Sequence, residues 1–314
     1  MIGSSKDHPI ERLTVSAADN ADDEHLRTAL AEIAGQDPTL TIDAEQRGIL
    51  HTLEGSGTSH LGSICDCLRG EYHVAINVGP LEAVLLETIR KPAEAEGKYI
   101  RQIGGHGNYG HCWLHIEPSK PHEGYAFTST VSADALPHDY LSSIDRGVQQ
   151  TMHSGVLSGQ HLVDLKVTVV DGSYHETDSN NFAFQIAGAI ALKNAVQKAV
   201  PVILEPMMSV EIEVPQGLAA AIRNEIYTHR GRVESDLAAD GLSEIQAIVP
   251  LAELLLSNSS TLAEFPTELT GYEPVSRGGR STDEGAGVTA NKPNHPRQGR
   301  GSESAWPDPP SQAE

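Results

Sequence analysis

The sequence is poor in the residues and patterns that define several classes of protein. It has only 3 cysteines in 314 residues, and two of them, Cys65 and Cys67, stand too close together for an ordinary disulfide. This favours buried thiols over a disulfide framework or a zinc site. No stretch approaches the roughly 20 apolar residues of a membrane-spanning helix, and no signal peptide is recognisable at the N-terminus. The expected location is the cytoplasm, with no membrane partner.

Motifs for nucleotide and hydrolytic chemistry are also missing. A phosphate loop reads G-x-x-x-x-G-K-[ST], and no lysine completes it here; Lys98 follows Gly97 but precedes Tyr99. The G-x-S-x-G elbow of hydrolases is absent as well. We therefore expect no catalytic residues, no cofactor and no enzymatic activity from this chain.

Positive charge is scarce relative to negative charge. The chain has 22 Lys and Arg against 43 Asp and Glu, a formal net charge of -21, whereas proteins that bind nucleic acid are usually basic. The excess acid is unevenly spread, because residues 97–205 carry 7 basic and 10 acidic side chains. That region permits contact with RNA, since phosphates raise the pKa of nearby histidines and so favour their charged form.

The most informative segment is a polar loop between two regular elements. Residues 163–170 are β-branched and mostly apolar, which predicts a strand. Residues 182–196 favour a helix, with Asp178 or Ser179 placed as its N-cap. The loop over 171–180 carries His175 near its tip. Loops held by rigid elements often bind partners; the alternative is an ordinary exposed turn.

This segment resembles domain IV of translation elongation factor G. The resemblance rests on Gly-Val-Leu-Ser-Gly at 155–159, the loop at 171–180 and Leu-Glu-Pro-Met-Met at 204–208. Gly-Lys-Tyr-Ile-Arg-Gln at 97–102 and Gly-Gly-His-Gly-Asn-Tyr-Gly-His at 104–111 are similar to another loop of that domain. Flanking motifs at 77–80, 87–89, 229–231 and 271–275 resemble parts of domains III to V. The similarity extends over roughly residues 9 to 276.

The resemblance implies where RNA is bound. In that family, domain IV enters the decoding site of the ribosome, and a loop histidine lies against the A-site transfer RNA; here this residue is His175. The implied contacts come from two tip segments: Gly105, His106, Gly107, Asn108 and Tyr109, and then Gly172, Ser173, Tyr174 and His175. The chain departs from the family at His106 and Asn108, where arginine and glutamine are usual. Gly172 is expected to allow a sharp turn.

The order of elements predicts an α+β protein. Two ferredoxin-like βαββαβ modules flank a domain IV-type module, whose left-handed βαβ crossover is implied by the resemblance. The expected organisation is a flexible N-terminus at 1–8, a domain III-like module at 9–90, a domain IV-like module at 91–205, a domain V-like module at 206–275 and a disordered tail at 276–314. The tail is rich in Gly, Ser, Pro, Asn and charge, which disfavours a packed core.

Two further questions concern metal and activity. His106, His111, His115 and His122 form a cluster in sequence, but no set of three or four ligands emerges, so no metal is expected. The favoured function is a non-enzymatic ribosome-binding protein related to translational elongation, whose partners are transfer RNA and ribosomal RNA at the A site. The alternatives are a folded remnant without independent activity, and a half-factor that needs a separate GTPase-domain protein.

Overall fold

The computed structural model describes residues 9–44, 50–103, 106–121, 123–132, 134–256, 262 and 265–275. The segments predicted as a flexible N-terminus (1–8) and a disordered tail (276–314) lie outside these residues. Helices and three mainly antiparallel sheets make up the described part, which confirms the α+β fold class. Within the same residues, no helix has the length and apolar character needed to cross a membrane.

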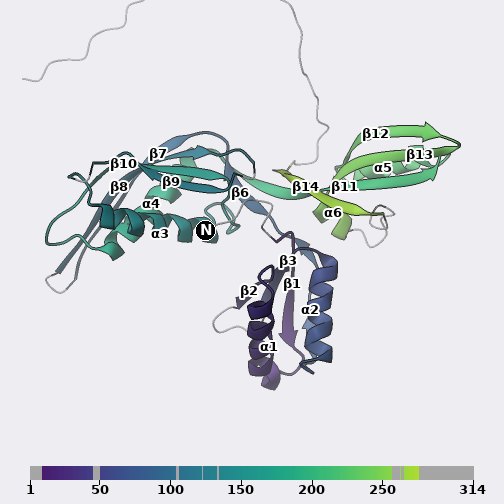
Figure 1. The fold of residues 1–314 in the computed structure, drawn as a ribbon, viewed down its shortest axis with the longest axis horizontal. Helices are drawn as coiled ribbons and strands as arrows, with labels where there is room; N and C mark the ends of the chain where they lie inside the picture. The colour runs from purple at the N-terminus through teal and green to yellow at the C-terminus, as the bar shows by residue number, and fades with distance from the viewer. Residues whose placement is uncertain are drawn as a thin grey trace, which may run out of the picture. The chain divides into compact units, whose positions relative to one another are not determined.

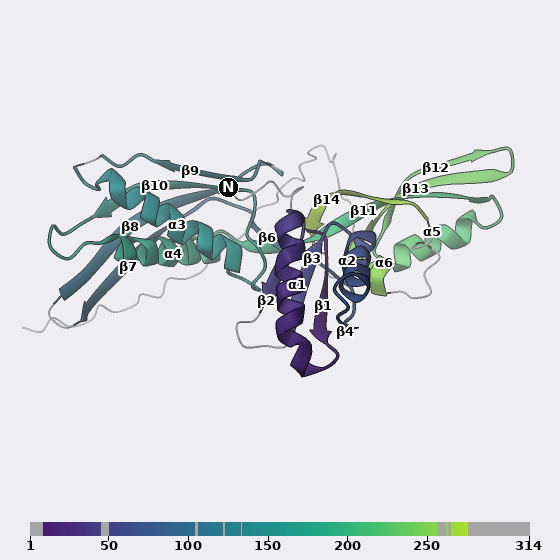
Figure 2. The same cartoon turned by 60° about the horizontal axis from the view of Figure 1, so that its bottom comes forward.

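The first sheet has the antiparallel order β2-β3-β1-β4 of a ferredoxin-like module. Its elements are β1 (Glu11–Ala17), η1 (Asn20–Asp22), α1 (Asp23–Gln36), β2 (Thr41–Ala44), β3 (His51–Gly55), α2 (Thr58–Gly70) and β4 (Ile76–Val78), with β5 (Glu82–Ala83) paired to β1. The two helices lie beside one another against the sheet (Figures 1 and 2). Strand β4 begins only at Ile76, because His73 has a φ of 54° and turns the chain before it.

The second sheet has the order β7-β8-β10-β9. Its module contains β6 (Leu86–Ile89), β7 (Ala93–Ile103), β8 (His106–Pro118), β9 (Tyr125–Ser129), α3 (His138–Ser154), β10 (Leu165–Ser173) and α4 (Asn181–Lys198). Strands β9 and β10 are parallel and are joined through α3, so a βαβ crossover is present. The left hand of that crossover stays a prediction. Helices α3 and α4 pack side by side against the sheet (Figure 2) and enclose a core that includes Leu114, Val167 and Phe184.

A buried carboxylate holds the loop between α3 and β10. Glu87 of β6 is fully buried, and its two oxygens accept hydrogen bonds from the backbone N–H groups of Val156, Leu157, Ser158 and Gln160. Burial alone would raise the pKa of Glu87, but these backbone donors bring it below its ordinary value. Gly155 and Gly159, with φ of 68° and 82°, let the loop fold around the carboxylate. The motif at 155–159 is therefore an anchor for the start of β10.

The third sheet repeats the ferredoxin-like order as β12-β13-β11-β14. Its elements are β11 (Pro201–Pro215), α5 (Ala219–Thr228), β12 (Arg232–Ala239), β13 (Leu242–Pro250), α6 (Leu251–Leu256) and β14 (Thr267–Pro274), and β6 pairs with the beginning of β11. Arg230 follows α5 and donates to both oxygens of the buried Glu205, at 2.7 and 2.8 Å. This ion pair links the turn after α5 to the first third of β11.

The cysteines are free thiols, as the sequence predicts. Cys65 and Cys112 are buried and Cys67 is half-buried. Burial raises the pKa of Cys112 to about 12. That thiol is therefore protonated at neutral pH and acts as a small apolar side chain in the core.

Candidate functional site

The loop that carries His175 is shorter than predicted. Strand β10 continues to Ser173, and α4 begins only at Asn181. The expectation that Gly172 makes a sharp turn is wrong, because Gly172 is a strand residue opposite Cys112. A Cβ atom on Gly172 would lie 3.0 Å from the carbonyl oxygen of His111 and 3.2 Å from a methyl group of Leu136. The glycine therefore serves close packing, and the turn is made further along.

The two predicted tip segments lie side by side. The N–H of Tyr109 donates to the carbonyl of Asp178 at 2.8 Å, and the hydroxyl of Ser179 donates to the carbonyl of Tyr109 at 3.0 Å. Glycines make this approach feasible. A Cβ atom on Gly107 would lie 2.4 Å from the carboxyl carbon of Asp178, and one on Gly110 would lie 2.4 Å from the carbonyl oxygen of Ala183.

The first tip segment begins with Gly105 and His106. Gly105 lies outside the described residues, and of His106 only the backbone, at the start of β8, is described. Gly107, Asn108 and Tyr109 belong to β8 rather than to a loop. The segment is therefore mostly the end of a strand that runs beside the loop over 174–180.

The N-cap of α4 is Asn180, so the prediction of Asp178 or Ser179 is wrong. The side-chain oxygen of Asn180 accepts from the N–H of Ala183 at 2.9 Å, and its amide nitrogen donates to the side chain of Asn108 at 2.8 Å. Ser179 is used elsewhere, because its hydroxyl oxygen accepts from the N–H of His175 at 2.9 Å. Contacts between β8 and the loop thus determine which residue caps α4.

His175 is the exposed residue at the centre of this arrangement. Its ring meets the ring of Tyr109 edge to face, with centroids 4.3 Å apart and planes at 89°. Its backbone is held twice by Ser179, since the N–H of Ser179 also donates to the carbonyl of His175 at 3.0 Å. Tyr174 turns the other way, and its half-buried ring lies against Tyr140 of α3. Of these two adjacent rings, that of His175 is the more exposed.

A chain of polar contacts begins at the hydroxyl of Tyr109. The Ser173 hydroxyl lies 2.8 Å from the hydroxyl of Tyr109 and 2.8 Å from Nδ1 of His111. Nε2 of His111 lies 3.1 Å from a carboxylate oxygen of Glu96 on the neighbouring strand. One proton assignment fits the two hydrogen bonds: Tyr109 donates to Ser173, and Ser173 donates to Nδ1. Nε2 is buried and makes no hydrogen bond, although Glu96 is close to it. Sequence reasoning missed His111 and Glu96 as site residues; their position on adjacent strands was the available signal.

Two of the four histidines considered for a metal, His111 and His115, lie close to carboxylates. His111 and His115 share one face of β8, as alternation predicts. Nδ1 of His115 lies 2.9 Å from Glu94, its direct cross-strand partner, whereas His111 is opposite Lys98 and reaches Glu96 diagonally through Nε2. His122 lies outside the described residues. Among the residues whose placement is described, no group of three or more His, Cys, Asp or Glu could hold a metal ion.

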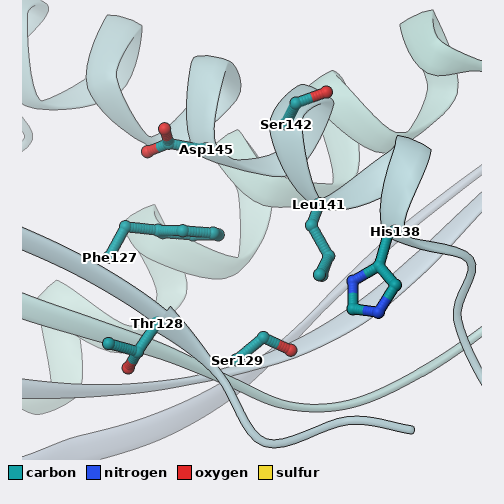
Figure 3. Close-up of a pocket in the computed structure, with 7 residues that line it drawn as sticks. All are labelled: Phe127, Thr128, Ser129, His138, Leu141, Ser142 and Asp145. Atoms are coloured by element: carbon teal, nitrogen blue, oxygen red, sulfur yellow. The ribbon is translucent and has the colours of Figure 1, made fainter. Parts of the chain in front are cut away.

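A separate hollow lies between β9 and α3 (Figure 3). Its volume is about 360 Å³, and it is lined by Phe127, Thr128, Ser129, His138, Leu141, Ser142 and Asp145. Asp145 is already engaged, because it accepts hydrogen bonds from the hydroxyl of Tyr125 and the amide of Gln149. Burial and the contact with Asp145 raise the pKa of Tyr125. The lining residues do not overlap with the predicted RNA-contact residues.

Comparison with known proteins identifies the three modules. The sequence models for elongation factor G domain III, domain IV and C-terminus match residues 7–80, 84–200 and 202–278, in that order. The chain therefore belongs to the elongation factor G family. The matches describe domain III, domain IV and the C-terminus of that factor, and none of them describes its GTPase domain. The whole candidate tip lies within the domain IV match.

A solved structure supports the same relationship. The crystal structure of a protein from Thermus thermophilus is similar to this chain with a TM-score of 0.62 and 31% sequence identity. The similarity covers 85% of this chain and 41% of that one. This elongation factor G-like chain thus spans about two fifths of the length of the protein it matches.

Proposed function

We propose that this chain is a cytoplasmic ribosome-binding protein related to translational elongation. In this proposal residues 91–205 form an arm whose tip contacts transfer RNA and ribosomal RNA in the A-site region. The chain supplies no GTPase chemistry of its own, because its sequence holds no phosphate loop. The observation that carries the proposal is the exposed His175 ring, held edge-on against Tyr109 at the end of the domain IV sheet.

The geometry suits RNA recognition for a physical reason. Single-stranded and looped RNA is bound through phosphates, ribose hydroxyls and unstacked bases, all of which an imidazole can contact. The backbone of His175 is fixed in both directions by Ser179, and Tyr109 is fixed by Ser173. Little ordering is then needed when RNA arrives, which lowers the entropic cost of binding.

The test is His175→Ala, measured by co-sedimentation with ribosomes at moderate salt. His175→Ala should weaken ribosome association by about 1 kcal/mol or more if a hydrogen bond to RNA is lost. The melting temperature should hardly change, because exposed loop side chains contribute little to stability. His25→Ala is the matched control, since His25 is an exposed histidine on α1 of the first module.

The competing functions make different predictions in the same assay. The decoding-site proposal fails if the wild-type chain does not pellet with ribosomes, or if wild type and His175→Ala pellet equally. Either result favours the alternative that the chain is a folded remnant without independent activity. A half-factor would pellet only when a separate GTPase-domain protein is added.

A further inference from the structure

An exposed aromatic side chain lies next to the tip but outside the predicted contact residues. Phe182, in the first turn of α4, is 61% exposed. Its ring meets the ring of Tyr99 edge to face, with centroids 6.3 Å apart and planes at 88°. Tyr99 is half-buried and packs on the domain IV core, so it holds Phe182 from one side and leaves the remainder of the ring in solvent.

Helix α4, which presents Phe182, contains no Asp or Glu, in a chain that is strongly acidic. Its two lysines, Lys193 and Lys198, lie towards its far end, so the cation considered next to the pair is Arg101. Arg101 is exposed and lies two residues after Tyr99 in β7, so alternation puts both on the same face of the strand. Glu94 and Glu96 belong to the opposite face, where they contact His115 and His111. The two glutamates of β7 are thus directed away from the pair.

The aromatic pair is also connected to the tip, through a hydrogen bond between two asparagine side chains. Asn180 caps the helix that presents Phe182 and donates to the side chain of Asn108. Asn108 is in turn the cross-strand partner of Arg101. One asparagine pair therefore ties Phe182 and Arg101 to the strand end beside His175.

We propose that Phe182, Tyr99 and Arg101 form a stacking ledge that receives an unpaired base of the RNA contacted by the tip. The proposal rests on the proposed function and adds a second contact to it. The Phe182 face offers a surface on which any base can stack, and Arg101 offers a cation for the adjoining phosphate. The absence of acidic side chains from α4 favours a polyanion over a protein surface of mixed charge.

The test compares three substitutions of Phe182 by titrating ribosomes in the co-sedimentation assay. Phe182→Ala should weaken binding about tenfold, since loss of stacking on one aromatic ring lowers affinity by about that factor. Phe182→Tyr keeps a ring and should bind like wild type. Phe182→Leu keeps an apolar side chain without a ring and should behave like the alanine variant. Leu237→Ala is the control, because Leu237 is 65% exposed on β12 of the third module.

Each outcome decides the proposal. If Phe182→Leu binds like wild type while Phe182→Ala does not, the ledge docks a protein and the RNA ledge is wrong. The ledge is equally wrong if His175→Ala weakens binding and Phe182→Ala leaves it unchanged, although the tip proposal then stands. Absence of wild-type binding overturns both. Thermal unfolding of each variant should match wild type, because the Phe182 ring is mostly in solvent.

Discussion

Replacing Glu87 by glutamine tests whether one buried carboxylate organises the loop between α3 and β10. One oxygen of Glu87 accepts from Val156 and Leu157, at 2.8 and 2.9 Å, and the other accepts from Ser158 and Gln160, at 2.6 and 3.2 Å. Glutamine has the same shape but only one acceptor oxygen. Whichever way its amide turns, an NH2 group meets two backbone N–H donors that then have no acceptor.

The size of the effect follows from that count. A buried donor left without an acceptor costs about 1–3 kcal/mol, so the two donors together cost about 2–6 kcal/mol. Loss of that size is a large part of the roughly 5–15 kcal/mol by which a typical protein is stable. Glu87→Gln should therefore lower the midpoint of urea unfolding, and the amides of 156–160 should exchange with solvent much faster than in wild type.

The pH dependence gives a second signature of Glu87. Its folded-state pKa is below the ordinary value of 4.5, because backbone donors outweigh the effect of burial. The stabilisation is therefore complete above about that pH and is lost as the pH falls through the lower, folded-state pKa. Glu87→Gln should remove this component, so that its stability declines less steeply in acid than that of wild type.

The control for Glu87→Gln is Glu82→Gln, the same chemical change at an exposed position in β5. It should leave both the urea midpoint and the amide exchange of 156–160 unchanged. The reasoning is refuted if the free energies of unfolding of Glu87→Gln and wild type differ by less than about 0.5 kcal/mol, the scatter of ordinary surface substitutions, and if the amides of 156–160 exchange equally slowly in both proteins.

Two further predictions concern nucleotide binding and the tip. Calorimetry should detect no stoichiometric binding of GTP in the micromolar range, because the chain has no phosphate loop; a clear micromolar isotherm would contradict this. Gly110→Ala should cost about 1–3 kcal/mol and weaken ribosome binding, since its Cβ would lie 2.4 Å from the carbonyl oxygen of Ala183 and would displace the start of α4. Gly62→Ala is its control, with no atom within 4 Å of the added Cβ; equal stability and binding of Gly110→Ala and wild type would refute the packing argument.

Local patterns in the sequence were sufficient for the order of elements. Leu26, Ala29, Leu30 and Ile33 recur at helical spacing, and all four are buried on α1. The ferredoxin-like order of the first and third sheets was predicted in the same way. These features depend on the periodicity of a helix or a strand, which each segment carries within itself.

Details that depend on a second segment were not predictable in this way. Asp178, Ser179 and Asn180 can each cap a helix, and Asn180 does so because Tyr109 and His175 already engage Ser179. Gly172 has a strand conformation because it pairs with Cys112 of β8, and His111 and Leu136 leave little room for a Cβ there. The approach of β8 to this loop thus decided both points.

Tertiary structure alone also selected the side chains that reach solvent at the tip. Tyr174 and His175 are adjacent in sequence and equally able to stack, yet one packs towards α3 and the other is exposed. The RNA contact proposed for Phe182 depends on its exposure and on its contact with Tyr99, which only the tertiary structure defines. Sequence periodicity specifies which elements form, whereas the accessibility of a ring depends on neighbours brought together from distant parts of the chain.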